Sequence, residues 1–372
     1  VLTDSELFRR LFNQNHGDNE GLLRAAEACS LVYSFEGEDL ESTDSELRTL
    51  APLVNCTASE LYRHVSTLMQ RDLVQRRSRW RAVLPQALAN RLAKAALQNI
   101  PGIDLLGSIG TSQRLLRSFS RRLGYLHDSP EAVEVAERWI DDEKWLANPA
   151  TLNELGQTML FNLAPLVPGK TLQALERAVA GDSGHAFVSA QQYSANRWLT
   201  LCCALAYEVP HFERAARLIL SFAEAEEGRM TTAKNAWTEL FQLFLSGVLA
   251  PPDQRASFLR SLLQDASRLR WELAAEAVAA MLKCSHFSSS RDFSFGARSR
   301  GFGWEPRSSD EYVAWFNIAF SLVEELVGRD GRPRQLVLTA AAHELRQLWD
   351  EDLLRPLVDA FVRRLASDGG WA

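Results

Sequence analysis

The stretch from Thr43 to Leu97 constrains the fold more than any other part of the chain. It begins with two short segments whose apolar residues recur at helical spacing, and these are followed by a basic, alternating segment, 73–84. Pro85 then opens another helical pattern, and proline is well tolerated at the start of a helix. Helix, turn, helix, hairpin and helix is the order of a winged-helix module whose wing is a two-stranded β-hairpin.

Local signals predict where the helices of this module begin and end. The apolar pattern predicts a helix over 21–35, and an acidic loop follows it. Thr43 or Asp44 is expected to cap the next helix. Thr57 and Glu60 have the spacing of a capping box, in which the side chain of each accepts a hydrogen bond from the backbone of the other.

Every periodic segment from about Thr111 onward is helical. The expected helices are 111–125, 129–141, 150–164, 169–180, 193–207, 209–226, 231–248, 253–264, 266–284, 308–327, 334–348 and 351–366. Several connections are short and contain proline or glycine, and short connections join antiparallel neighbours. The sequence therefore predicts a mainly α fold, with a winged-helix module over 1–100 and an α-solenoid of HEAT-like helical pairs over 101–372.

Composition narrows the class of protein. The chain is 46% hydrophobic and 24% charged, which is ordinary for a globular protein, and its net charge is −6. This balance argues against a nucleic-acid or membrane surface along the whole chain. The five cysteines form no CxxC pair, so a cytoplasmic protein with reduced thiols is expected. Because the chain starts at Val1, it is expected to be a segment of a longer protein.

Segments 31–40, 75–93 and 117–127 together resemble the region behind the ATPase core of bacterial STAND NTPases. These are the NACHT or NB-ARC-like signalling ATPases used in defence against phage, and segment 286–298 resembles their helical array. The resemblance implies that this chain is a regulatory and sensor region without enzymatic activity of its own. It implies three partners: an upstream NTPase domain in the same polypeptide, a phage or other trigger protein on the solenoid, and further copies in a homo-oligomer. ATP or ADP is expected in the upstream domain, and no cofactor in this chain.

A cluster of basic side chains surrounds the wing, opposed locally only by Asp72: Arg71, Arg76, Arg77, Arg79, Arg81, Arg91 and Lys94. One interpretation is a DNA-binding face that places the preceding helix in the major groove and the wing on phosphates. A second is a solvated or internally paired face. The resemblance implies a third, contact with the nucleotide domain through Arg79, Arg81 and Gln86. In the family a phosphate-sensing histidine follows the wing, and Gln86 occupies its approximate place here.

Residues 164–171 satisfy a loosened P-loop pattern in which Ala164 replaces the first glycine. A P-loop needs a preceding strand and backbone N–H groups that curl around phosphates. Here a helical pattern precedes the segment, and Pro165 and Pro168 each remove one N–H donor. We therefore expect a turn between helices. Histidine and cysteine spacings typical of a zinc site are missing from the sequence, so no metal is expected.

The segment 285–307 is the most unusual part of the array, because it interleaves aromatic and arginine residues with three glycines. One hypothesis is a plug in which the aromatic side chains fold back onto the helices. The other is a partner surface, because aromatic and arginine side chains are common interface anchors. The candidate partner-binding residues are Arg291, Arg298, Arg300 and Trp304, and glycines are expected to let the backbone present Arg298 and Arg300 outward. Two alternative functions stay open: a DNA-binding regulator with a helical sensing domain, and a helical interaction scaffold.

Overall fold

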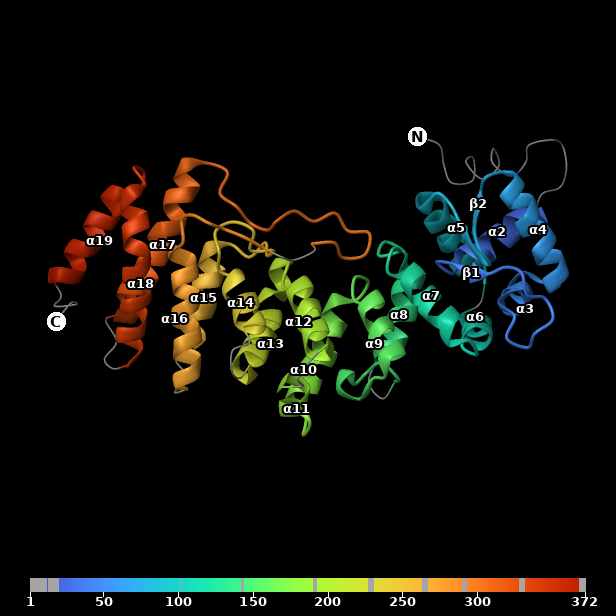
Figure 1. Ribbon diagram of the computed structural model, residues 1–372, viewed down its shortest axis with the longest axis horizontal. Helices are drawn as coiled ribbons and strands as arrows, with labels where there is room; N and C mark the ends of the chain where they lie inside the picture. The colour runs from blue at the N-terminus through green and yellow to red at the C-terminus, as the bar shows by residue number, and fades with distance from the viewer. Residues whose placement is uncertain are drawn as a thin grey trace. The chain divides into compact units, whose positions relative to one another are not determined.

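The computed structural model describes residues 12, 20–100, 102–141, 144–189, 193–226, 231–262, 267–289, 293–327 and 332–367. The protein is mainly helical and has a small three-stranded antiparallel sheet, which confirms the coarse fold class (Figure 1). The chain divides into two compact units. The first comprises 1–174 with 295–298, and the second comprises 175–294 with 299–372. The boundary expected between residues 100 and 101 stays a prediction.

The first unit begins with the sheet and the helices around it. Its elements are α2 (Glu20–Ser30), β1 (Phe35–Glu36), α3 (Glu46–Leu50), η1 (Ala51–Val54), α4 (Ala58–Gln70), β2 (Val74–Arg77), β3 (Trp80–Val83) and α5 (Gln86–Asn99). Strand β3 lies between β1 and β2 and pairs antiparallel with both, so that Arg81 is opposite Phe35 on one side and Arg76 on the other. The predicted hairpin is therefore present, with β1 as a third strand.

Strand β1 is the element that the sequence pattern missed. The helix expected over 21–35 ends at Ser30, because the backbone after it bonds to α7 (Gln113–Leu123) instead of continuing the helix. The Tyr33 N–H donates to the Ser118 carbonyl, and the Ser34 N–H donates to the Ser118 hydroxyl. A residue whose N–H is used this way cannot also donate to its own helix.

The helix-turn-helix part of the module agrees more closely with the sequence. The N-cap of α3 is Ser45, whose side chain accepts from the Arg48 N–H, so the expected caps at Thr43 or Asp44 are wrong by one or two positions. The capping box of Thr57 and Glu60 at the start of α4 is confirmed. Leu61, Val65 and Leu68 of α4 are buried, as their helical spacing requires.

The remaining elements of the first unit are α6 (Gly102–Ile109), α7, α8 (Pro130–Ile140), η2 (Pro149–Thr151) and α9 (Glu154–Leu163), and α10 (Pro168–Ala180) starts in it. Helix α7 packs on α9. The P-loop-like segment is a turn followed by the first residues of α10, as expected. The Lys170 ammonium pairs with Asp141, and the Thr171 hydroxyl is buried and donates to the Val167 carbonyl.

The second unit consists of helices that pack chiefly on near neighbours along the chain. They are α11 (Gly184–Ser189), α12 (Tyr193–Leu205), η3 (Val209–His211), α13 (Phe212–Ala225), α14 (Thr232–Glu239), α15 (Pro252–Leu262), α16 (Arg268–Leu282), α17 (Ser309–Val327), α18 (Arg332–Asp350) and α19 (Arg355–Ser367). Helix α12 packs on α13, α13 on α14, α14 on α16, and α16 on both α17 and α18 (Figure 1). Within the described ranges, no helix is long and apolar enough to cross a membrane.

One helix predicted for this unit is only half as long as expected, because its second half is not helical. The pattern predicted 231–248, but α14 ends at Glu239 and residues 240–250 are irregular. The reason is Arg255 of α15, which is fully buried and collects carbonyls of this segment as hydrogen-bond acceptors. Leu245 adopts a positive φ of 59°, a conformation that a helix does not permit.

Candidate functional site

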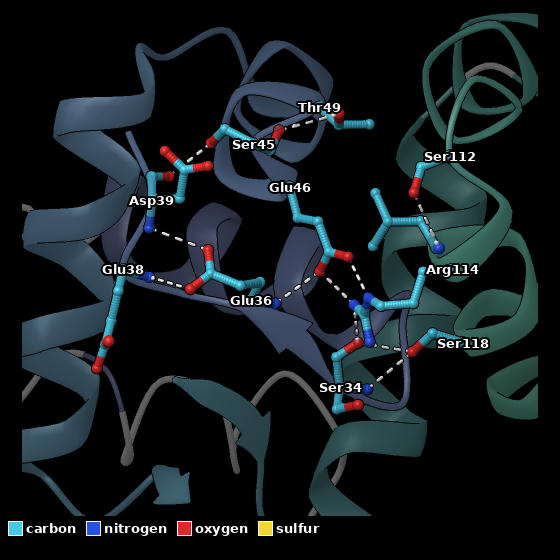
Figure 2. Close-up of polar contacts among 11 residues, drawn as sticks. Ser34, Glu36, Glu38, Asp39, Ser45, Glu46, Thr49, Ser112, Arg114 and Ser118 are labelled. Atoms are coloured by element: carbon cyan, nitrogen blue, oxygen red, sulfur yellow. Dashed lines mark hydrogen bonds and ion pairs between the residues drawn. The ribbon is translucent and has the colours of Figure 1, made fainter. Parts of the chain in front are cut away.

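A buried ion pair joins the sheet of the first unit to its neighbouring helices (Figure 2). The Glu46 carboxylate of α3 pairs with the Arg114 guanidinium of α7 and accepts from the Glu36 N–H of β1 at 2.6 Å. Arg114 also donates to the Ser34 carbonyl at 2.9 Å. The Glu46 side chain is only 7% exposed and that of Arg114 is 34% exposed, so removal of Arg114 would leave the Glu46 carboxylate buried without its counterion.

Ser118 provides a second connection between α7 and the segment before β1. Its hydroxyl donates to the Ser34 carbonyl at 2.6 Å and accepts from the Ser34 N–H at 3.0 Å (Figure 2). Both serines lie beside the Glu46–Arg114 pair. We call these four residues, Ser34, Glu46, Arg114 and Ser118, the α7 clamp. The clamp fixes the position of α7 on the strand, so a displacement of α7 must either carry the sheet with it or break these bonds.

The acidic loop after β1 is ordered by its own carboxylates. Glu36 accepts from the Asp39 N–H at 2.9 Å (Figure 2). Asp39 in turn accepts from the Ser42 and Glu41 N–H groups. These backbone donors hold the pKa of Asp39 below its usual value, because they stabilise the ionised carboxylate.

Two arginines of the wing are paired inside the module. The Arg81 side chain is 4% exposed, and Arg81 and Arg76 both donate to the Glu38 carboxylate at 3.0 Å. The guanidinium of Arg79, at the hairpin turn, lies over the Trp80 ring at 4.9 Å. The internally paired interpretation therefore describes Arg76 and Arg81. The contacts expected between Arg79 or Arg81 and a nucleotide domain stay predictions.

Gln86 is engaged by a buried arginine that the sequence did not single out. The Arg122 guanidinium of α7 donates to the Gln86 side-chain oxygen at 2.7 Å and to the Asn90 side-chain oxygen at 2.6 Å. Arg122 is fully buried, and burial lowers its pKa to about 10. The arginine-rich pattern of 117–122 gave no way to tell which arginine faces inward. The expected role of Gln86 toward a nucleotide is a prediction still.

In the second unit, the aromatic and arginine segment packs onto the helices. Trp304 stacks on Trp315 with 5.5 Å between ring centroids, and the Trp304 backbone N–H donates to the Val248 carbonyl at 2.7 Å. The Gly247 N–H donates to the Phe302 carbonyl at 2.8 Å. The Trp304 side chain therefore folds back onto the helices, as the plug hypothesis expects. A role for Trp304 in partner binding is a separate prediction.

Arg300 does not point outward as expected. Its side chain is 4% exposed, donates to the Ala204 carbonyl at 2.6 Å and lies over the Tyr207 ring at 4.5 Å. Glu208 is 3.6 Å away and supplies the opposite charge. The expectation was wrong because glycine permits backbone freedom but does not choose a direction, and here a ring, a carbonyl and a carboxylate attract the guanidinium.

The other two candidate arginines are placed differently. Arg298 is half-buried and belongs to the group 295–298 of the first unit, where it forms an isolated β-bridge with Phe295. Gly296 between them has a positive φ of 64°, and a Cβ there would lie 2.4 Å from the Gly124 carbonyl oxygen. Arg291 lies outside the described residues.

A pocket of about 390 Å³ opens in the second unit between α12, α14 and the aromatic and arginine segment. We call it the α12–α14 pocket. Its lining residues are Leu199, Thr200, Cys203, Ala204, Tyr207, Thr232, Asn235, Ala236, Glu239, Gly247, Phe293 and Arg300. The volume lies within the range of small-ligand sites. Sequence reasoning had identified Arg300, but not the two helices that complete the pocket.

The described residues contain no group of three histidine, cysteine or acidic side chains that could hold a metal ion. Comparison with known proteins gives no family: no protein-family model, no curated protein and no solved structure matches this chain.

Proposed function

We propose that this chain is the regulatory and sensor region of a STAND-type signalling NTPase in anti-phage defence. In this proposal the helical array is a solenoid that recognises a phage or other trigger protein. Residues 20–99 are a winged-helix module that relays the recognition to an NTPase domain in the same polypeptide. The chain itself carries no hydrolytic chemistry, and nucleotide is held by the NTPase domain.

The observation that carries the proposal is the α7 clamp. The order of elements from α2 to α5, with β3 central in the sheet, agrees with a winged helix. Helix α7 is joined to that sheet by the buried Glu46–Arg114 pair and by Ser118, and it packs on α9 of the array. Such a connection supports a relay, because a protein interior is closely packed and a shift of one helix therefore displaces the elements that are bonded to it and packed on it.

The same geometry weighs against the DNA-binding regulator. Arg76 and Arg81 share Glu38, so their charge is partly neutralised within the module. The acidic loop lies beside them and carries further carboxylates. A DNA-binding surface instead gains affinity by releasing counterions from several phosphates, which requires unpaired positive charge.

The gene provides the first test. We expect the codons upstream of Val1 to encode a Gly-rich P-loop and, some tens of residues later, an acidic strand. An upstream region that lacks both would overturn the proposal. The chain alone should neither bind ATP in isothermal titration nor shift duplex DNA at physiological salt. Tight, steeply salt-dependent DNA binding that is lost in Arg79→Ala would favour the regulator.

The relay itself is tested in the full-length protein by Arg114→Ala. We expect the variant to lose protection against phages that the unaltered protein restricts, because α7 then loses its ion pair with Glu46 and its hydrogen bond to the Ser34 carbonyl. The matched control is Arg117→Ala on the same helix, whose pair with Glu154 spans 3.5 Å and is half-exposed or more on both sides. Equal protection by the Arg114 and Arg117 variants, both folded by thermal melt, would contradict a relay through the clamp.

A further inference from the structure

We propose that the α12–α14 pocket anchors a tryptophan or tyrosine side chain from a peptide segment of a partner protein. This inference rests on the proposed function only in taking the partner to be the trigger protein that the helical array recognises. The pocket itself is a property of the second unit, and its binding is measurable without any NTPase domain.

The pocket has the layout of an anchor site. Leu199, Cys203 and Ala236 are buried and form apolar walls, while Thr200 and Asn235 are exposed and line the same cavity. A cavity of about 390 Å³ is large enough for an indole or phenol ring. Buried apolar surface with a polar edge is the usual arrangement around an interface anchor, since burial of the anchor excludes water.

The walls favour an aromatic anchor over an aliphatic one. Tyr207 and Phe293 contribute rings, and the Arg300 guanidinium lies over the Tyr207 ring. Aromatic pairs gain energy beyond the apolar area that they bury. The Thr200 hydroxyl donates to the Asn196 carbonyl at 2.8 Å, so its proton is used and its oxygen can act toward a ligand as an acceptor, as an indole N–H or a phenol O–H requires.

The walls are also held in place before any ligand arrives. The Tyr207 hydroxyl accepts from the Gly301 N–H at 3.0 Å, and the Tyr207 carbonyl accepts from the Leu249 N–H at 2.7 Å. Arg300 is fixed by the Ala204 carbonyl. Because these groups are ordered already, binding would cost little conformational entropy.

Phe302 argues for a peptide rather than a free aromatic molecule. It is 59% exposed and contacts Phe293 edge to face, with 5.5 Å between ring centroids. Phe293 lines the pocket, whereas Phe302 does not. An exposed ring beside the cavity offers apolar contact to the residue next to an anchor in a peptide, a contact that a single indole filling the cavity does not make.

The test uses the 372-residue chain and three probes in isothermal titration: N-acetyl-tryptophanamide, and the capped dipeptides Trp-Leu and Leu-Trp. We expect all three to bind, with at least one dipeptide about tenfold tighter, as burial of a leucine side chain against Phe302 would give. Phe302→Ala should remove that gain and leave the binding of N-acetyl-tryptophanamide unchanged. Thr200→Trp should abolish binding of all three by filling the pocket from its edge.

The matched control for the filling variant is Ser257→Trp, at an exposed position on α15 of the same unit, which should bind as the unaltered chain does. Failure of all three probes to bind would overturn the aromatic anchor. Binding of N-acetyl-tryptophanamide without any gain for either dipeptide would overturn the peptide source in favour of a small aromatic molecule. Either failure leaves the STAND proposal standing, since that depends on the upstream sequence and the α7 clamp.

Discussion

Replacing Arg255 by methionine should destabilise the second unit more than any exposed arginine change. Arg255 is fully buried on α15, and its guanidinium donates to the carbonyls of Leu240, Gln242, Val248 and Ala250. Burial lowers its pKa to about 9, so it stays protonated at neutral pH and keeps all of its donors. Methionine fills similar space but donates no hydrogen bond.

The magnitude follows from the carbonyls that lose their donor. The Val248 carbonyl keeps the Trp304 backbone N–H as a donor, so three carbonyls are left unsatisfied: those of Leu240, Gln242 and Ala250. Each buried acceptor left unsatisfied costs about 1–3 kcal/mol, so three carbonyls at the lower end cost about 3 kcal/mol. The substitution also removes a buried charge, which recovers part of the desolvation cost and makes the upper end of the range unrealistic. We expect Arg255→Met to reduce the free energy of unfolding by about 3–5 kcal/mol.

Urea unfolding followed by circular dichroism measures the loss. Amide hydrogen exchange of residues 240–250 localises it, because the Gly247 and Leu249 N–H groups are hydrogen-bonded only while this segment keeps its shape. The matched control is Arg260→Met on the same helix. Its pair with Glu325 is half-exposed, so it should cost at most about 1 kcal/mol. A loss in Arg255→Met no larger than in Arg260→Met would refute the reasoning.

Two further predictions concern backbone strain and pH. Gly303 has a φ of 109°, and a Cβ there would lie 2.8 Å from the backbone of Val248, so Gly303→Ala should cost at least about 2 kcal/mol in urea unfolding. Gly301→Ala meets nothing within 4 Å and should cost less than about 0.5 kcal/mol; equal losses would contradict the steric argument. The pKa of Asp39 is below its usual 3.8, chiefly because the Ser42 N–H donates to it. Its contribution to ordering the acidic loop is therefore fully present above pH 3.8 and is lost as pH falls through the lowered pKa. The protection of the loop amides, measured as their exchange rate relative to that of an unfolded chain at the same pH, should fall over that acidic range and lose this pH dependence in Asp39→Asn; an unchanged profile in that variant would contradict it.

The places where the sequence pattern failed share one cause. Helical periodicity reports which residues are apolar, but it is blind to polar groups that divert the backbone. The helix over 21–35 was overestimated because Ser118, far away in sequence, bonds to the backbone of Tyr33 and Ser34. The helix over 231–248 was overestimated because Arg255 collects carbonyls from its second half. In both cases the competing partner is a polar side chain that only the folded chain brings near.

The candidate site residues illustrate the same limit. Arg300 was identified from composition, since an arginine among aromatics and glycines is unusual in an array of helices. Its burial over Tyr207 and the pocket that it lines with Asn235 depend on packing between helices. Arg122, which holds Gln86, was one of several arginines on α7 and could not be distinguished by spacing alone.

The sequence by itself determined the mainly helical class, the β-hairpin after two helices and the capping box at Thr57. It also determined that the P-loop-like segment 164–171 is a turn between helices. These are local properties, set by apolar spacing, by hydrogen bonds over three or four residues and by the missing N–H of proline. The tertiary structure alone decided the third strand, the buried Glu46–Arg114 pair and the α12–α14 pocket. Each of these joins groups tens of residues apart, and burial, which decides whether a charge is paired or solvated, exists only once the helices have packed.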